Sequence, residues 1–374
     1  MSEERKRILK LVEEGKLNAN EALTLLEALE AKQTNQSTFE SESNVHEVST
    51  QVEKGKQNTH EQKNHSYKQS SVKSKLVDFI DSAVKKIKDL DLDFNFGNGV
   101  EVNHIFQHSD VLLKQIDLDV ANGSVDIIPW NENDVRIECE AKVYKLDTTE
   151  AARSTFLQDV IFSIEGGKLR FSVQKKQMKV VAKVFVPSEQ YEHVKVRMFN
   201  GPISGEGLNV KHFKGKTANG SIKFSKLAST SVELETANGH IELNDCFTKE
   251  CELETINGTI NVTGSMEKLD VQSFNGNVIC RLIDDQCHTL QVRTTTGNVD
   301  IFTPTTRPID GELKSNLGGF SCEIPHMNIV EEKSEVVQKY MRFKTKPGEG
   351  QGEKLYIFAD TKTGSVIIKP NDVR

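Results

Sequence analysis

Several residue patterns that mark common protein classes are missing from this chain. Among its 374 residues there is one tryptophan, and no apolar run approaches the roughly 20 residues that span a bilayer. The charged start MSEERKRILK lacks the apolar stretch and small-residue cleavage site of a secretory signal. Neither a G-x-x-x-x-G-K-[ST] phosphate loop nor a G-x-S-x-G serine motif occurs. We expect a cytoplasmic location, with membrane or envelope association as the alternative, and no signal peptide or transmembrane segment.

Basic charge and paired cysteines are also scarce. The formal net charge is -7 with both signs interspersed, whereas a nucleic-acid-binding domain usually carries a basic surface. None of the six cysteines belongs to a C-x-x-C pair, so a reduced compartment fits better than a disulfide framework. The sequence therefore predicts no nucleic-acid partner, no metal site and no cofactor.

What the chain does contain is an Asn-Gly pair that returns at a nearly constant interval. Five consecutive pairs are separated by steps of 19, 19, 19 and 18 residues. We call the residue before each glycine the anchor. Thr296 and Thr363 are anchors in the same frame, and Gly166-Gly167 and Leu317-Gly318 fit it more loosely. Such a fixed period indicates a repeat architecture. The predicted turn residues are Asn122, Gly123, Asn200, Gly201, Asn219, Gly220, Asn238, Gly239, Asn257, Gly258, Asn275, Gly276, Gly297 and Gly364.

Apolar or small residues occupy fixed places around each anchor: two, four and six residues before it, and three and five residues after it. For the anchor Asn238 these are Val232, Leu234, Thr236, Ile241 and Leu243. This alternation predicts two short strands with one inward face around each glycine turn. Because glycine adopts positive φ at little cost, we expect the repeat glycines to do so, and Gly239→Val to cost roughly 1 to 3 kcal/mol.

Two architectures accommodate such units. Asn-Gly between alternating apolar residues is the strongest short hairpin signal. A unit of 19 residues can instead form one coil of a parallel β-helix, in which like residues stack on like. Such stacking explains why the residue two places before the anchor is so often hydroxylated, as in Thr217, Thr236 and Thr255. We therefore predict a mainly β protein whose repeats form a parallel β-helix, or β-solenoid.

The chain before the repeats has three segments of different composition. Residues 1–31 predict a short helical hairpin, because a capping box precedes a leucine stripe. Residues 32–71 are polar and almost free of aliphatic side chains, which predicts a disordered linker. Residues 72–92 regain helical periodicity as an amphipathic helix, which either caps an end of the stack or lies on an anionic membrane. The repeat domain is expected over 98–374, with helix formers at 147–158.

Acidic residues with the potential for chemistry fall on the outward positions of the strands. Asp117 and Asp119 share one strand face, with Asp126 on the return strand, and a glycosidase needs paired carboxylates. We interpret these carboxylates as solvated outer faces, on which Glu235→Lys should cost less than about 0.5 kcal/mol. An acidic strip able to contact a cation or a sugar would contain Glu233, Glu235, Glu242, Glu252 and Glu254.

Histidine and tryptophan give weaker signals. His104 and His108 are four residues apart and have no third ligand nearby in the sequence, so they predict no metal site. Trp130 follows a strand and is expected to be a packing or rim aromatic. No catalytic residue is predicted.

The segment ILKLVEEGKLNANEALTLLEAL, the polar linker and the repeats IDLDVANGSVDII and ELETANGHIEL resemble the LiaX/YvlB-type bacterial proteins. Those proteins pair a short SHOCT-like helical module with an adhesin-like β-strand repeat domain of unassigned function. The resemblance covers nearly the whole chain. It implies a β-helix, a link to cell-envelope stress responses in Gram-positive bacteria, and no assigned catalysis.

Two functions from different classes fit these observations. The first is a non-enzymatic scaffold or sensor, in which a rigid solenoid presents a surface and residues 1–31 bind a protein partner or self-associate. Residues 72–90 would add contact with a membrane surface. The second is a carbohydrate-active enzyme, a polysaccharide lyase or hydrolase, because parallel β-helices also host such enzymes. An enzyme requires carboxylates that converge in a cleft, whereas a scaffold presents flat ladders.

Overall fold

Alternating apolar and polar residues form strands throughout the part of the chain that the structure describes. The computed structural model describes residues 99–335, 338–345 and 353–371. The helical hairpin, the linker and the amphipathic helix expected before residue 98 lie outside these ranges. Within them, 22 strands join into one sheet beside a single helix, so the protein is mainly β as predicted. The chain divides into units 1–71 and 72–374, and all described residues belong to the second.

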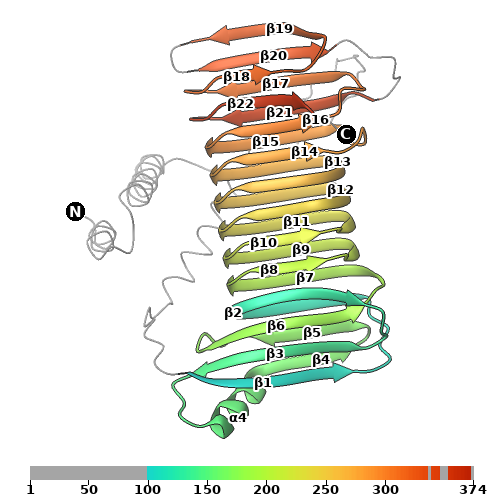
Figure 1. Ribbon diagram of the computed structural model, residues 1–374, viewed down its shortest axis with the longest axis vertical. Coiled ribbons are helices and arrows are strands. Elements are labelled where there is room, and N and C mark those ends of the chain that lie inside the picture. Colours follow the sequence, from blue (N-terminus) through green and yellow to red (C-terminus); the bar gives the residue numbers. More distant parts are fainter. Residues whose placement is uncertain (1–98, 336–337, 346–352, 372–374) are drawn as a thin grey trace, which may run out of the picture. The chain divides into compact units, whose positions relative to one another are not determined.

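The strands that lead into the anchors form the first of two parallel ladders. Residues with the same place in successive repeats are direct partners, so Leu234 pairs with Gly215 on one side and with Leu253 on the other. Each anchor therefore stacks on the anchor of the next repeat. The strands of this ladder lie one above another along the stack (Figure 1). The strands are the first half of β2 (Gln115–Trp130), β7 (Gln190–Asn200), β9 (Asn209–Asn219), β11 (Ala228–Asn238), the second halves of β12 (Ile241–Asn257) and β13 (Ile260–Asn275), and β15 (Thr289–Thr296).

The strands that follow the anchors form the second parallel ladder. Ile241, for example, pairs with Ile222 and with Ile260. β12 and β13 run through both ladders, so the chain passes from one ladder to the other in each repeat. This solenoid-like arrangement excludes the antiparallel hairpin alternative for these repeats. The strands are the second half of β2, β8 (Ile203–Glu206), β10 (Ile222–Ser225), the first parts of β12 and β13, β14 (Val278–Leu282) and β16 (Val299–Thr303).

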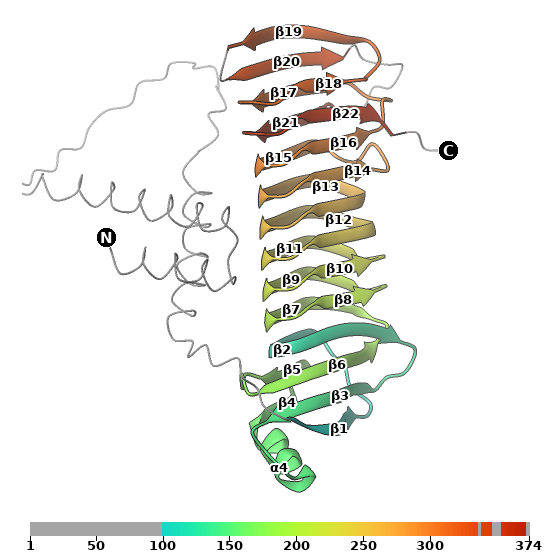
Figure 2. The ribbon, with the colours of Figure 1, turned by 60° about the vertical axis from the view of Figure 1, so that its left-hand side comes forward.

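The last repeats stack in an order that differs from the sequence. β21 (Leu355–Thr361) pairs with β15 on one side and with β17 (Ile309–Ser315) on the other. β22 (Val366–Pro370) likewise lies between β16 and β18 (Phe320–Cys322). The repeat around Thr363 is thus inserted between those around Thr296 and Leu317 (Figure 2). The frame of Leu317-Gly318 is confirmed, because Ser315 pairs with Thr361 two places before their anchors.

Antiparallel strands end the parallel stack in both directions. The second ladder continues from β2 to the parallel β6 (Met178–Pro187), and then to β3 (Val135–Tyr144) and β1 (Gly99–His108), each antiparallel to the strand before it. The first ladder continues to the parallel β5 (Lys168–Val173) and then to the antiparallel β4 (Val160–Glu165). β20 (Lys339–Thr345) runs antiparallel to β17, and β19 (Met327–Ser334) to β20. Gly166-Gly167 is a hairpin turn between β4 and β5, so the repeat frame is wrong there. The parallel repeats therefore span only part of the described residues.

Helix α4 (Thr149–Asp159) lies at the β1 end of the stack (Figure 1). Thr148 Oγ1 accepts the N–H of Ala151 at 3.3 Å, which caps the first turn. Ala152 and Phe156 are buried, and the Phe156 ring centre lies 6.3 Å from that of Phe106 on β1. The helix predicted at 147–158 is confirmed. Within the described ranges, no helix has the length and apolar character needed to cross a bilayer.

The other end of the stack finishes on β19. A register shift between Ile329 and Glu331 distorts its pairing with β20, and Glu331 forms a 2.6 Å ion pair with Lys333. Bulges and charged side chains on an edge strand discourage pairing with another chain. β19 therefore has the features of a protected edge.

Inward side chains from both ladders form one continuous core. Leu234 and Leu253 have no exposed surface, and Cys251 and Cys280 are buried in the same inward phase, as the repeat predicts. All six cysteines are free thiols. Burial raises the pKa of the Cys139 thiol to about 12, so this thiol stays protonated and packs as a small apolar group.

Candidate functional site

The anchors form a ladder of asparagine side chains along one edge of the stack, which we call the asparagine edge. Asn238 Nδ2 donates to Asn219 Oδ1 at 2.9 Å, and Asn257 Nδ2 donates to Asn238 Oδ1 at 2.8 Å. The backbone N–H of Gly239 donates to the carbonyl oxygen of Asn257 at 2.9 Å. These bonds satisfy polar groups that a tight turn otherwise leaves unpaired. The same side-chain bond links Asn122, Asn200, Asn219, Asn238, Asn257 and Asn275 in order.

Hydroxyl groups reinforce the same edge from inside. Thr236 Oγ1 donates to the carbonyl oxygen of Gly220 at 2.9 Å, and Thr255 Oγ1 donates to that of Gly239 at 3.1 Å. The hydroxylated position two places before the anchor therefore binds the glycine of the neighbouring repeat. This contact explains the pattern from which like-on-like stacking was predicted.

Most of the repeat glycines are needed because the backbone of a neighbouring repeat lies close to them, and only some because they adopt positive φ. The φ prediction is confirmed for Gly123, Gly201 and Gly297, at +130°, +138° and +148°. It is wrong for the others, Gly220, Gly239, Gly258, Gly276 and Gly364, whose φ lies outside the left-handed region. A Cβ on Gly239 would lie 1.9 Å from the carbonyl oxygen of Gly220. Each glycine leaves room for the backbone of the repeat stacked against it.

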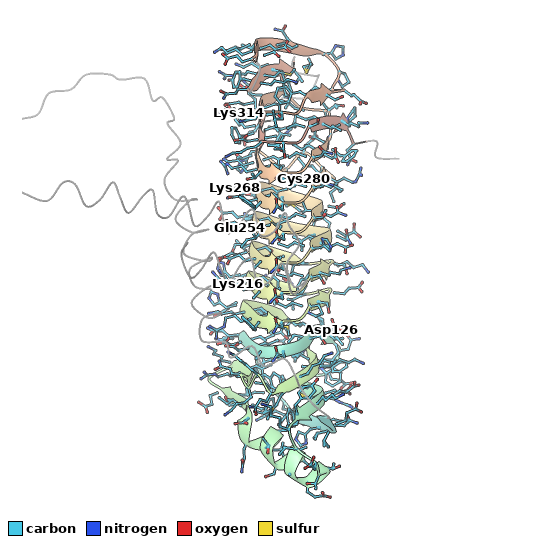
Figure 3. All side chains as sticks on the ribbon, turned by 90° about the vertical axis from the view of Figure 1, so that its left-hand side faces the viewer. Asp126, Lys216, Glu254, Lys268, Cys280 and Lys314 are labelled. Carbon is cyan, nitrogen blue, oxygen red and sulfur yellow. The ribbon has the colours of Figure 1, made fainter. Side chains whose placement is uncertain are left out.

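Outward side chains on the first ladder form what we call the charged face. Their sign changes in blocks along the stack, from acidic to basic and back to acidic. In Figure 3, Lys216, Glu254 and Lys268 lie on one side of the stack and Asp126 on the other. The charged face comprises the residues five and three places before each anchor from Asn122 to Thr296: Asp117, Asp119, Lys195, Arg197, Lys214, Lys216, Glu233, Glu235, Glu252, Glu254, Asp270, Gln272, Gln291 and Arg293.

Opposite charges pair where the blocks adjoin. Lys214 Nζ lies 2.5 Å from Glu233 Oε1, and Lys216 forms an ion pair with Glu235 in the same two repeats. Further pairs join Asp117 to Lys168 at 3.2 Å, Asp119 to Arg197 at 2.7 Å and Asp270 to Arg293 at 3.5 Å. Solvated pairs of this kind contribute little stability, about 0 to 1 kcal/mol each. They hold the long side chains in register along the face.

The predicted acidic strip is present, except that Glu242 lies elsewhere and Asp270 takes part. Glu233 pairs in register with Glu252, and Glu235 with Glu254. Asp270 continues the first of these rows, as the partner of Glu252. Glu242 does not belong, because it follows its anchor and therefore faces outward from the second ladder, where it lies 3.1 Å from Lys223.

Two neighbouring carboxyls of this strip have opposite pKa shifts. Partial burial and a hydrogen bond shared with Glu233 raise the pKa of Glu235. The pKa of Glu233 falls to about 2 although burial opposes this, because hydrogen bonds from Glu235 and Lys214 favour its ionised form. Glu235 therefore keeps a proton to higher pH than Glu233 does. Burial also raises the pKa of Asp270, against the attraction of Arg293.

We expect Asp270→Asn to stabilise the protein at neutral pH by up to about 1 kcal/mol. A carboxyl whose pKa is raised on folding stabilises fully below its unfolded value of 3.8, and loses that contribution as pH rises through the folded pKa. The gain from Asn should therefore be absent below about pH 4 and grow above it. Urea unfolding midpoints between pH 4 and 8 would measure it, with the exposed Glu250→Gln as control. A less stable variant at pH 7 would show that the Arg293 contact outweighs burial.

The remaining candidates do not come together. Asp117 and Asp119 lie on the charged face, whereas Asp126 lies on the second ladder and accepts a 2.8 Å hydrogen bond from Ser204 (Figure 3). The predicted pair of Asp117 and Asp119 therefore faces one side of the stack, and Asp126 on the return strand faces the opposite side. Because two carboxyls must flank one bond in a glycosidase, this set lacks that geometry.

His104, His108 and Trp130 have structural surroundings. The His104 ring packs 4.4 Å from that of Phe106, and burial lowers its pKa. His108 Nδ1 lies 3.1 Å from the carbonyl oxygen of Ser109. Trp130 Nε1 donates to the Asp134 carbonyl oxygen at 2.8 Å, and its ring lies 5.3 Å from that of Phe185, which fits the packing aromatic of the two roles predicted for it. Across the described ranges, no three His, Cys, Asp or Glu side chains are placed to hold a metal ion.

A row of apolar side chains, which the repeat pattern was not used to predict, lies beside the asparagine edge. The position directly before the anchor lies on the outer side of the strand, because the position two before it faces the core. Phe274 is the most exposed member of this row, at 39%, whereas Ala237 is buried, at 9%. We call this row the apolar stripe. The sequence held the signal, since the outward positions three and five before the anchor are charged or polar in the same repeats. The apolar stripe consists of Ala121, Phe199, Ala218, Ala237, Ile256 and Phe274.

Comparison with known proteins identifies relatives over most of the chain. Residues 113–345 match the family described as Toastrack DUF4097, and residues 3–34 match a SHOCT-like domain. The uncharacterized protein YvlB of Bacillus subtilis (strain 168) is 48% identical over 369 residues, which cover 99% of each chain.

Solved structures with a similar trace are more distant. A candidate adhesin from Parabacteroides distasonis ATCC 8503 is 11% identical, with 73% of this chain and 98% of that chain covered and a TM-score of 0.42. A candidate adhesin from Bacteroides fragilis NCTC 9343 is also 11% identical, with 72% and 97% covered and a TM-score of 0.37. These values are too low to carry an inference about function.

Proposed function

Because the chain belongs to the Toastrack DUF4097 family, we propose that it is a non-enzymatic interaction protein of the bacterial cell-envelope stress response. In this proposal its repeats form a parallel β-helix that presents a rigid surface, and residues 1–31 recruit a protein partner or self-associate. The match of residues 3–34 to a SHOCT-like domain supports a separate module at that end. The stress link rests on the resemblance to LiaX/YvlB-type proteins.

One observation carries the proposal: the charged face is a broad surface whose charges alternate in blocks. Glu233 and Glu235 contact Lys214 and Lys216 of the preceding repeat. Complementary charge blocks on a partner would fix its register along the stack and speed the encounter. A surface of this kind favours binding over bond cleavage, which needs groups that converge on one reacting atom.

The alternative, a carbohydrate-active enzyme, is supported less well. Asp117 and Asp126 were the carboxylates best placed in the sequence, and they face opposite sides of the stack. An assay for release of reducing ends or unsaturated sugars from bacterial wall polysaccharides distinguishes the two functions. Product formation that Asp117→Asn abolishes would support the enzyme.

A pull-down from envelope-stressed bacteria tests the proposed function directly. The full-length chain is expected to retain a specific partner, and a chain without residues 1–31 is expected to lose it. The double variant Glu252→Lys/Glu254→Lys should weaken a partner that uses the charged face. Glu242→Lys on the second ladder is the matched control and should not. Equal retention by all four proteins would reject the proposal.

We expect a chain that begins at Lys73 to melt at nearly the temperature of the full-length protein. The reason is that about forty polar residues, 32–71, would transmit little packing energy between the module and the repeats. Differential scanning calorimetry of both chains measures the difference. A large fall in melting temperature would mean that residues 1–71 stabilise the repeat domain, and the recruiting role would then have to be abandoned.

A further inference from the structure

The apolar stripe is an unusual feature for the outside of a charged stack. In the repeat of Asn275, Phe274 is 39% exposed, whereas Asp270 and Gln272 of the same strand are polar and more buried. Phe199 and Phe274 stand toward the ends of the stripe, and the small residues Ala218 and Ala237 lie between them. Five strand spacings of about 4.8 Å separate Ala121 from Phe274, so the stripe is about 24 Å long. The stripe is a continuous apolar row on an otherwise polar side of the stack, which makes it a candidate contact surface for another element.

The described chain begins on the same edge of the stack. Gly99 pairs with Tyr144 on β3, Val143 pairs with Met178 on β6, and Val180 pairs with Gly123, next to the anchor Asn122. Gly99 is therefore three strand spacings, about 14 Å, from the first row of the stripe. The eight residues 91–98 can span up to about 27 Å. Whatever precedes them is thus within reach of the stripe.

The sequence before residue 91 has the right length and pattern to cover that row. As a helix, residues 72–90 would extend about 28 Å at 1.5 Å per residue, against about 24 Å for the stripe. Their apolar positions fall on one helical face: Val72, Leu76, Phe79, Ile80, Ala83, Ile87 and Leu90.

Charge favours one direction for this segment. The short reach of residues 91–98 puts Leu90 at the Ala121 end and Val72 at the Phe274 end. Lys73 and Lys75 would then lie level with Glu254 and Asp270 of the neighbouring charged face. Attraction between these groups supports the same orientation.

We propose that residues 72–90 form an amphipathic helix that docks along the apolar stripe, antiparallel to the direction in which the repeats stack. This is an interaction within the chain that covers the side of the stack. The end cap considered for this segment is supplied at β1 by α4. A docked segment buries the face with which it would lie on a membrane, so the two placements exclude one another.

Hydrogen exchange of the full-length protein tests the docking. Backbone amides of 72–90 should exchange at least about tenfold more slowly than in an unstructured peptide. Ala218→Arg, in the middle of the stripe, should remove that protection. Asn261→Arg, at an outward position of the second ladder, is the control and should leave it intact. Phe79→Ser should also remove it, without any change in the stack. Unprotected amides in the wild type, or protection that survives Ala218→Arg in a protein that melts normally, would overturn the proposal.

Disulfide trapping tests the direction in which residues 72–90 run along the apolar stripe, and whether they are what occupies it. Ala83 lies about 10.5 Å from Leu90 along a helix, and Ala218 lies two strand spacings, about 9.6 Å, from Ala121. Oxidation should therefore join Ala83→Cys to Ala218→Cys within one molecule, and should not join Ala83→Cys to Thr295→Cys. Cross-linked dimers would assign the stripe to a second copy of the chain. Protection of 72–90 that appears only with anionic phospholipid vesicles would assign the segment to a membrane. Either result rejects docking.

Discussion

Replacement of Leu234 by aspartate is expected to destabilise the repeat domain by more than about 4 kcal/mol. Leu234 has no exposed surface, and its strand neighbours in register are Gly215 and Leu253. A carboxyl at this point has no cation to pair with inside the core. It must either remain ionised in an apolar surrounding or bind a proton at neutral pH, and both cost free energy of folding.

Urea unfolding followed by circular dichroism measures this loss. The control is the adjacent Glu235→Gln, which should change the free energy of unfolding by less than about 1 kcal/mol. Glu235→Lys, expected from the sequence to be harmless, is a poor control because Glu235 contacts Lys216, and a second ammonium group there would repel the first. Equal losses from Leu234→Asp and Glu235→Gln would mean that the inward and outward positions are assigned wrongly.

Gly239→Val is expected to cost more than about 3 kcal/mol, at or above the top of the range that the sequence suggested. Since the φ of Gly239 lies outside the left-handed region, backbone strain is not the reason. The cause is the 1.9 Å separation between a Cβ at this position and the carbonyl oxygen of Gly220. Relief of that contact would separate two repeats and break the bond from Gly239 N to Asn257 O.

Gly319→Ala is the matched control, since nothing lies within 4 Å of its Cβ position. This variant should be neutral or slightly stabilising, because alanine reduces the freedom of the unfolded chain. The denaturant midpoints of Gly239→Val and Gly319→Ala, each compared with that of the wild type, test this prediction. A Gly239→Val protein as stable as Gly319→Ala would show that the repeats are not in close backbone contact at the asparagine edge.

Both predictions concern the interior and the edge, whereas binding is assigned to outward surfaces. The stack separates these roles because alternate residues of a strand face opposite sides. Leu234 stabilises the core, and Glu233 and Glu235 on the same strand form part of the charged face. Variants of outward residues should therefore change partner binding while the melting temperature stays nearly constant, which allows function and folding to be tested apart.

Local features of the sequence determined the strands, their inward residues and the positions of the turns. Alternation around Asn238 identifies Leu234 and Ile241 as core residues, because the pleat of a strand sends successive side chains to opposite faces. The interval of 19 residues identifies which residues are equivalent. Alternation lies within a few residues and the interval is visible along the sequence, so neither signal needs knowledge of which strands pair.

Only the tertiary structure decided how the strands pair and why certain residues are needed. Side-chain parity around an anchor is the same in a hairpin and in a coil, so the parallel pairing of Leu234 with Leu253 could not be read from alternation. The insertion of β21 between β15 and β17 depends on contacts between distant residues, since Thr361 pairs with Thr294 67 positions away and with Ser315 46 positions away. The need for glycine at position 239 likewise follows from the backbone of Gly220 that is stacked against it. Glu242 is separate from the acidic strip because its strand pairs in the second ladder. The free energy of the whole stack decides which strands pair, so a short window of sequence cannot predict the pairing.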